Sequence, residues 1–161
     1  MAGVFLFLKK LKQRLVIGPE IPILNCIEAW CFAQIGDFEM KFDLYQIQYS
    51  EADRAEINAG KINRKREIRS DMMCDFKGTQ IAGLASEAFD DNLYTKVSTI
   101  IAEDWNDAFE VGNIGPENQI IRHGRMASVS VGDILVDEEG QITVVANVGF
   151  YAIGFQPKIA A

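Results

Sequence analysis

The chain contains a single histidine, His123, which lies within an Arg-His-Gly-Arg sequence. Nucleophilic catalysis needs a nucleophile, a base and a group that orients the base. No spacing in the sequence singles out a nucleophile for His123 among Cys26, Cys31 and Cys74. The sequence therefore favours a histidine in a basic turn at the surface or at a strand edge. An enzyme that uses His123 with a carboxylate or with Cys74 is the least favoured function.

The three cysteines also give little support to a metal site or a disulfide framework. Cys26 and Cys31 are separated by four residues, which is not a usual zinc half-site, and one histidine cannot complete such a site convincingly. An odd number of irregularly spaced cysteines argues against a set of disulfides. We expect reduced thiols in a cytoplasmic protein, with no metal and no cofactor.

Paired carboxylates are abundant, but they fall where helix caps and turns are expected, and acids are favoured there for structural reasons. No glycine-rich phosphate-binding loop is present. We therefore predict no catalytic residues. Two interpretations of the acids stay open: scattered solubilising groups, or one acidic face that binds a partner and imitates the phosphate spacing of DNA. The residues of that face would be Asp90, Asp91, Glu103, Asp104, Asp107, Glu110 and Glu117.

Basic residues form one dense cluster, at Lys61, Arg64, Lys65, Arg66 and Arg69. Such a cluster can contact phosphate groups or an acidic partner. It lacks interleaved aromatic residues, so a solvated basic face of a helix is the competing interpretation. A second, smaller basic spot lies at Arg122 and Arg125. Binding to nucleic acid becomes more credible if the two spots converge in space.

Composition and charge point to a globular protein that avoids nucleic acid and membranes. The 161 residues are 48% hydrophobic and 24% charged, enough for one domain with a real core. Residues 1–39 are neutral, so the formal net charge of −7 belongs to residues 40–161. The apolar run Val4–Leu8 is shorter than the roughly 20 residues needed to span a bilayer, and basic residues follow it instead of preceding it. We expect no membrane contact and no export signal.

The chain is expected to fold as one domain over residues 40–154. Gly18-Pro-Glu-Ile-Pro22 interrupts the apolar N-terminal stretch, because proline lacks an amide donor and restricts its predecessor. Residues 1–39 are predicted to be an extension outside the core, with Met40 as an alternative natural start. Residues 155–161, which contain Pro157, are predicted to be a flexible tail.

The first half of the domain gives a mixed prediction. Lys41–Tyr49 alternates, with Tyr45, Ile47 and Tyr49 on one face and glutamines on the other, as in a half-buried strand. Ser50 and Asp53 then predict a capping box for a helix that ends near Gly60. We assign no structure to residues 61–80.

Further along, Ile81–Phe89 predicts a short helix, and the β-branched run Tyr94–Ala102 predicts a strand. Asp104 is expected to cap a helix that Gly112 ends and that buries one face. The members of that face are Trp105, Ala108 and Phe109. Asn113–Pro116 has the composition of a turn.

The C-terminal part predicts three consecutive strands. A turn at Gly132–Asp133 leads into Ile134–Val136, and Asp137–Gly140 connects it to Gln141–Val148. Gly149 permits a bend before the last strand, Phe150–Ile153. The order of elements predicts a single α+β domain with a mostly antiparallel sheet, two to three packed helices and a C-terminal three-stranded meander.

Residues 107–151 carry a resemblance to known proteins. Asp107–Glu117, Arg125–Ile134 and Val148–Tyr151 are similar to small uncharacterised proteins encoded by phages and other mobile elements. They also resemble the C-terminal element of YodL-like and KfrB-like domains, which share a Ser-Val-Gly-Asp turn, a hairpin and a closing Gly-Phe. The resemblance implies an accessory or host-interaction role, and it supplies no catalytic residues.

Three functions follow in order of preference. The first is a non-enzymatic accessory protein of a phage or mobile element that binds a macromolecular partner, most naturally a host protein. The second is a nucleic-acid-associated module that uses Lys61–Arg69 with Arg122 and Arg125. The third is the His123 enzyme. Assembly into a homo-oligomer is left open.

Overall fold

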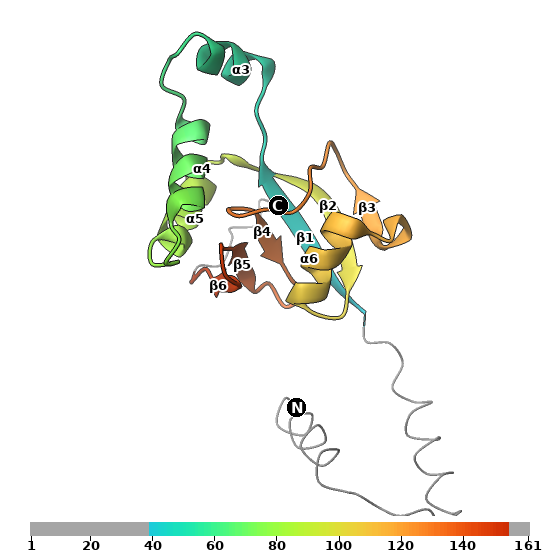
Figure 1. Ribbon diagram of the computed structural model, residues 1–161. Coiled ribbons are helices and arrows are strands. Elements are labelled where there is room, and N and C mark those ends of the chain that lie inside the picture. The colour runs from blue at the N-terminus through green and yellow to red at the C-terminus, as the bar shows by residue number, and fades with distance from the viewer. Residues whose placement is uncertain (1–38, 155–161) are drawn as a thin grey trace, which may run out of the picture. The chain divides into compact units, whose positions relative to one another are not determined.

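A computed structural model describes residues 39–154 of the chain (Figure 1). The chain divides into two units, Met1–Asp37 and Phe38–Ala161, and the described residues all belong to the second unit. The predicted N-terminal extension, Cys26, Cys31 and the predicted tail at 155–161 lie outside the described residues.

The described residues build one six-stranded sheet in which all neighbouring strands are antiparallel. The strand order is β3-β2-β1-β4-β5-β6, so the first strand is central and the last three form a meander. This confirms the predicted α+β class and the C-terminal three-stranded element. The strands are β1 (Met40–Ile47), β2 (Tyr94–Ala102), β3 (Ile120–Arg122), β4 (Ile134–Val136), β5 (Ile142–Val145) and β6 (Phe150–Ala152).

Helices cover both faces of the sheet. The four α-helices are α3 (Glu51–Asn58), α4 (Arg64–Cys74), α5 (Ile81–Asp90) and α6 (Trp105–Ile114), and a 3-10 turn follows at Glu117–Gln119. One core cluster joins α4 and α5 to Ile134 and Val144, and a second joins α6 to Leu135 and Val145. Since adjacent strand residues point to opposite faces, the two clusters lie on opposite sides of the sheet.

Strand β1 differs from the predicted half-buried strand. Phe42 and Leu44 are fully buried on the α6 side, and Ile47 is buried on the α4–α5 side. Gln46, expected on a solvated face, is only 2% exposed. Its amide is satisfied by the backbone of Ala127, to which it both donates and accepts. A long-range loop therefore covers the face that the alternation assigned to solvent.

Helix α6 ends three residues later than predicted. Asp104 caps it through the backbone N–H groups of Asn106 and Asp107, as expected. Gly112, predicted to end the helix, is buried within it, and the helix terminates at Gly115 with φ of 91°. Gly112 is required for a different reason: an added Cβ would lie 2.3 Å from Val129 Cγ2. The glycine therefore marks a close approach between α6 and a loop.

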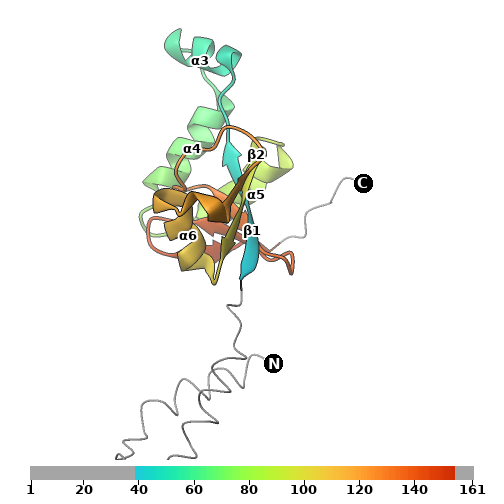
Figure 2. The same cartoon turned by 90° about the vertical axis from the view of Figure 1, so that its right-hand side faces the viewer.

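Helix α3 stands apart from the rest of the described residues, as Figure 2 shows at the top of the view. It has the predicted capping box of Ser50 and Asp53, but none of its residues is buried. Polar groups connect it to α4: Lys65 donates to Asp53 over 2.8 Å, and Asn63 donates to both Asp53 and Glu56. The Lys65 ammonium beside Asp53 holds the pKa of that carboxyl well below its usual value.

Candidate functional site

His123 is the end of a hydrogen-bonded chain that runs across three strands. Thr99 Oγ1 lies 2.7 Å from Asp43 Oδ1 and 2.9 Å from His123 Nε2. Lys96 pairs with the second carboxylate oxygen of Asp43 at 2.6 Å. These hydrogen-bonded side chains lie on the side of β1 and β2 that faces away from α6, and the His123 imidazole is exposed. Among residues 39–154, Thr99 is the side-chain partner that orients the His123 imidazole.

A β-bulge in β2 sets this geometry. Leu44 faces Ser98 and Tyr45 faces Lys96, so Val97 is an additional residue opposite β1. The Val97 carbonyl accepts hydrogen bonds from the backbone N–H groups of His123 and Gly124. Without the bulge, the chain after β3 would lack these two acceptor contacts. The sequence contained no signal for this arrangement, because Asp43, Thr99 and His123 are brought together only by strand register.

The hydrogen-bond roles fix one tautomer of His123. An ionised carboxylate only accepts, so the single Thr99 hydroxyl proton is donated to Asp43. In the neutral imidazole, the Thr99 oxygen then accepts from His123, which places the proton on Nε2 and leaves the lone pair on Nδ1.

We expect Thr99→Val to abolish this preference for the Nε2–H tautomer and leave a mixture of the two tautomers. Long-range nitrogen–proton NMR spectra of the neutral imidazole measure it, and an unchanged Nε2–H tautomer in the variant would contradict the assignment.

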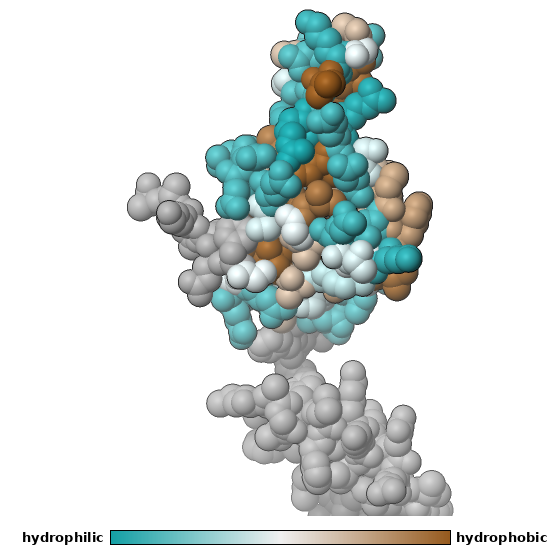
Figure 3. All heavy atoms as spheres, turned by 90° about the vertical axis from the view of Figure 1, so that its left-hand side faces the viewer, coloured by the Kyte–Doolittle hydropathy of each residue, from teal (hydrophilic) through white to brown (hydrophobic). Residues whose placement is uncertain are grey.

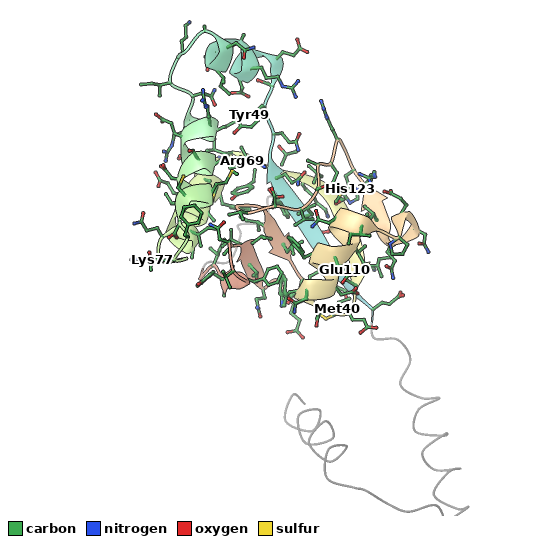
Figure 4. All side chains as sticks on the ribbon, viewed as in Figure 1. Met40, Tyr49, Arg69, Lys77, Glu110 and His123 are labelled. Carbon is green, nitrogen blue, oxygen red and sulfur yellow. The ribbon has the colours of Figure 1, made fainter. Side chains whose placement is uncertain are left out.

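The sequence left open an enzyme that uses His123 with Cys74 or with a carboxylate, and this arrangement completes neither site. Cys74 ends α4 and is exposed, whereas His123 follows β3 at the opposite edge of the sheet (Figure 4). Asp43 is near, but it contacts the imidazole only through Thr99. Neither of the two described concavities is lined by His123. The hydrogen-bonded residues Asp43, Thr99 and His123 thus orient an exposed imidazole that lies outside both of these concavities.

A second polar cluster is buried at the Ser130–Asp133 turn. Asp133 is 2% exposed, and its Oδ2 accepts from Gln46 Nε2 at 2.8 Å and from the Ser130 backbone at 2.9 Å. Arg69 donates to Ser130 Oγ, and the Tyr94 hydroxyl donates to the Gly132 carbonyl. Burial raises the pKa of the Asp133 carboxyl to about 6, although the hydrogen bonds oppose this change. The cluster joins β1, β2, α4 and the turn, and it has a structural role.

The predicted basic cluster lies on or beside α4, but most of its charges are already used. Arg64 pairs with Glu87 and Asp91 of α5, Lys65 pairs with Asp53, and Arg69 donates to Ile47 and Ser130. Lys61 and Arg66 make no ion pair or side-chain hydrogen bond with any residue in the range 39–154. These two cations and Arg64 line an open concavity at the start of α4.

The structure does not merge the two basic spots into one surface. Arg122 pairs with Glu117 at 2.9 Å beside β3, while α4 packs with α5 beyond the other half of the sheet. Arg125, three residues further on, makes no ion pair among the described residues. Within the basic cluster, Arg69 reaches the loop after Arg125, where it donates to Ser130.

The predicted acidic residues are likewise divided between two regions. Asp90 and Asp91 lie at the end of α5, and Asp91 pairs with Arg64. Asp104 and Asp107 are engaged at the start of α6, where Asp107 accepts from the Glu103 backbone. Strand β2 runs between the two groups, and the helices belong to opposite core clusters. The acids therefore do not form one continuous face.

Exposed hydrophobic residues gather where the end of α4 meets the β5–β6 turn. Figure 3 shows the side of the molecule formed by α4 and α5, where hydrophobic residues reach the surface among hydrophilic ones. We call four of them the apolar patch. They are Met73 (52% exposed), Phe76 (76%), Val148 (80%) and Tyr151 (37%).

Direct contacts hold the two halves of the apolar patch together. Asn147 donates to the Met73 carbonyl at 3.2 Å and to the Asp75 carbonyl at 3.3 Å. An added Cβ at Gly78 would lie 2.4 Å from the Tyr151 hydroxyl. Asp75 accepts from the backbone of Gln80 and Ile81, which fixes the loop that carries Phe76. The patch is thus a supported surface, formed by segments about 75 residues apart in sequence.

No helix within residues 39–154 is long and apolar enough to cross a bilayer. Within the same range, no group of three or more histidine, cysteine, aspartate or glutamate side chains could hold a metal ion. Models of known protein families, curated proteins and solved structures were also compared with the chain, and none of them matches it.

Proposed function

We propose that this protein is a non-enzymatic binding module that docks a protein partner on the apolar patch. The observation that carries the proposal is the gathering of Met73, Phe76, Val148 and Tyr151 on one supported surface. Large contiguous apolar patches on soluble proteins mark interaction sites, whereas single exposed apolar residues need no explanation. The mobile-element setting and a cytoplasmic location belong to this proposal, through the resemblance of residues 107–151.

The nucleic-acid alternative has weaker support. Phosphate binding needs cations that are free to replace condensed counterions. Arg64, Lys65 and Arg69 already contact acidic or backbone oxygens of the chain itself. A net formal charge of −7 also opposes approach to a polyanion.

Site-specific photocrosslinking tests the proposal. Phe76 is replaced by p-benzoylphenylalanine in the full-length protein, and Ile114 is replaced in the same way as a control. Ile114 is 82% exposed but ends α6, on the opposite side of the sheet. We expect position 76 to crosslink one discrete protein in the expressing cells and position 114 to give no such band. No band from position 76, or the same band from both positions, would overturn the proposal.

A further inference from the structure

We infer that the partner presents a short segment that is both acidic and apolar, and that this segment lies along the outer face of α4. The inference rests on the proposed function, because it extends the apolar patch toward the start of the same helix. It assigns a chemistry to the partner, namely carboxylates that meet cations beside α4 and large side chains that meet the apolar patch.

The first support is the distribution of unpaired cations. Within residues 39–154, the cations that make neither an ion pair nor a side-chain hydrogen bond are Arg54, Lys61, Arg66, Lys77 and Arg125. Three of them belong to the α4 region: Lys61 precedes the helix, Arg66 lies in its first turn, and Lys77 follows it. Figure 4 shows Lys77 beyond the end of α4. Positive charge that the fold does not use is therefore concentrated beside one helix.

The second support is the continuity of the outer face of α4. Ile68 and Met72 are buried, so the helix turns its other side outward. Arg66 and Met73 are seven residues apart, which is two helical turns, so they lie on one stripe about 10 Å apart along the axis. Ile62, 82% exposed, adds an apolar group to the concavity that Lys61 and Arg66 line. Basic and apolar groups are thus mixed along the whole length of α4.

The third support distinguishes a peptide from a nucleic acid. Glu67 and Asp71 line the same concavity as Arg66, and they interrupt any continuous track for a phosphate backbone. A short segment can instead place single carboxylates at Lys61 and Arg66, because its charges are not spaced at every residue. A segment that carries both carboxylates and apolar side chains satisfies the cations and covers the apolar groups together.

A display library of random 12-residue peptides, panned against the full-length protein, tests the inference. We expect the enriched peptides to contain both Asp or Glu and large apolar residues. Arg66→Glu should weaken their binding about fivefold or more, because charge reversal converts attraction into repulsion. Arg125→Glu is the matched control, since it reverses an equally exposed and unpaired arginine outside the α4 region, and it should change binding less than twofold.

A second pair of variants separates failure of the inference from failure of the proposed function. Phe76→Ser with Val148→Ser should abolish binding of the enriched peptides, and Ile114→Ser should leave it unchanged. Purely apolar peptides that are insensitive to Arg66→Glu would overturn the inference while the proposed function stands. Equal enrichment on wild type and on the Phe76→Ser, Val148→Ser variant would overturn both. Retention of single-stranded DNA that Arg66→Glu abolishes would overturn the inference in favour of a nucleic acid.

Discussion

Asp133→Asn is expected to raise the free energy of unfolding at pH 7 to 8 by about 2 kcal/mol, because it removes a buried charge. Oδ2 accepts all three hydrogen bonds that Gln46 and Ser130 donate to this carboxyl, so an asparagine oxygen in the same place keeps them. Urea unfolding at pH 4.5, 5.5 and 7.5 measures the effect.

The expected pH dependence follows from the raised pKa of Asp133. Its carboxyl has a pKa of about 6 in the folded protein and roughly 4 in the unfolded chain. Between these values the folded protein binds more protons, so Asp133 makes the wild type lose stability as the pH rises from about 4 to about 6. The loss is complete above pH 6 and absent below pH 4. The Asn variant should lack this slope. If the variant had a lower free energy of unfolding than the wild type, by the same amount at all three pH values, the assignment would be contradicted.

Asp133→Ala provides the comparison. It removes the charge, the acceptor of the Ser130 N–H and one of the three acceptors of the Gln46 amide. Buried donors without partners cost about 1–3 kcal/mol each. We therefore expect the Ala variant to be less stable than the Asn variant at every pH, with the same flattened slope.

Gly112→Ala is expected to lower the free energy of unfolding by about 2 kcal/mol, the usual range for an overpacked core. The new Cβ would lie 2.3 Å from Val129 Cγ2 and 3.1 Å from Ile100 Cδ1, both of which are buried. Val129 is β-branched and cannot easily turn away. Thermal or urea unfolding of the purified variant measures the loss.

Gly83→Ala is the matched control for this prediction. Gly83 also lies within a helix, α5, but nothing stands within 4 Å of an added Cβ. Alanine should stabilise this position by up to about 1 kcal/mol, since glycine is the poorer helix former. Val129→Ala in the Gly112→Ala background should recover part of the loss. Equal effects at positions 83 and 112 would contradict the packing explanation.

Local residue types predicted five of the six described strands, and the short edge strand β3 (Ile120–Arg122) was not predicted. The β-branched run Tyr94–Ala102 forms β2 with the predicted bounds, and Gly132–Asp133 precedes β4 as expected. Gly112 and Gln46 were misinterpreted for a common reason. Gly112 has the residue type of a helix stop, but its role depends on Val129, and the burial of Gln46 depends on Ala127. Such tertiary contacts override local propensity.

The candidate sites were predictable only in their parts. The residues of the basic cluster were identified, but their pairing with Asp53, Glu87 and Asp91 arises from helix packing that no local pattern encodes. The apolar patch joins residues 73–76 to residues 148–151, and no local pattern indicates that these two segments meet. The contact between Thr99 and His123 requires the correct register of β2 and the bulge at Val97.

The central position of β1 has a consequence for synthesis on the ribosome. Among the described strands, β1 (Met40–Ile47) is made first, and its partners in β2 and β4 follow about 50 and 90 residues later. At roughly 5–20 residues per second, β2 becomes available first, and the edge of β1 that pairs with β4 stays unpaired for about 5–20 s. Asp43 and Gln46 interrupt its apolar residues with polar groups that later find native partners. During that interval these two side chains discourage pairing with other nascent chains, so they protect the product before it has a fold.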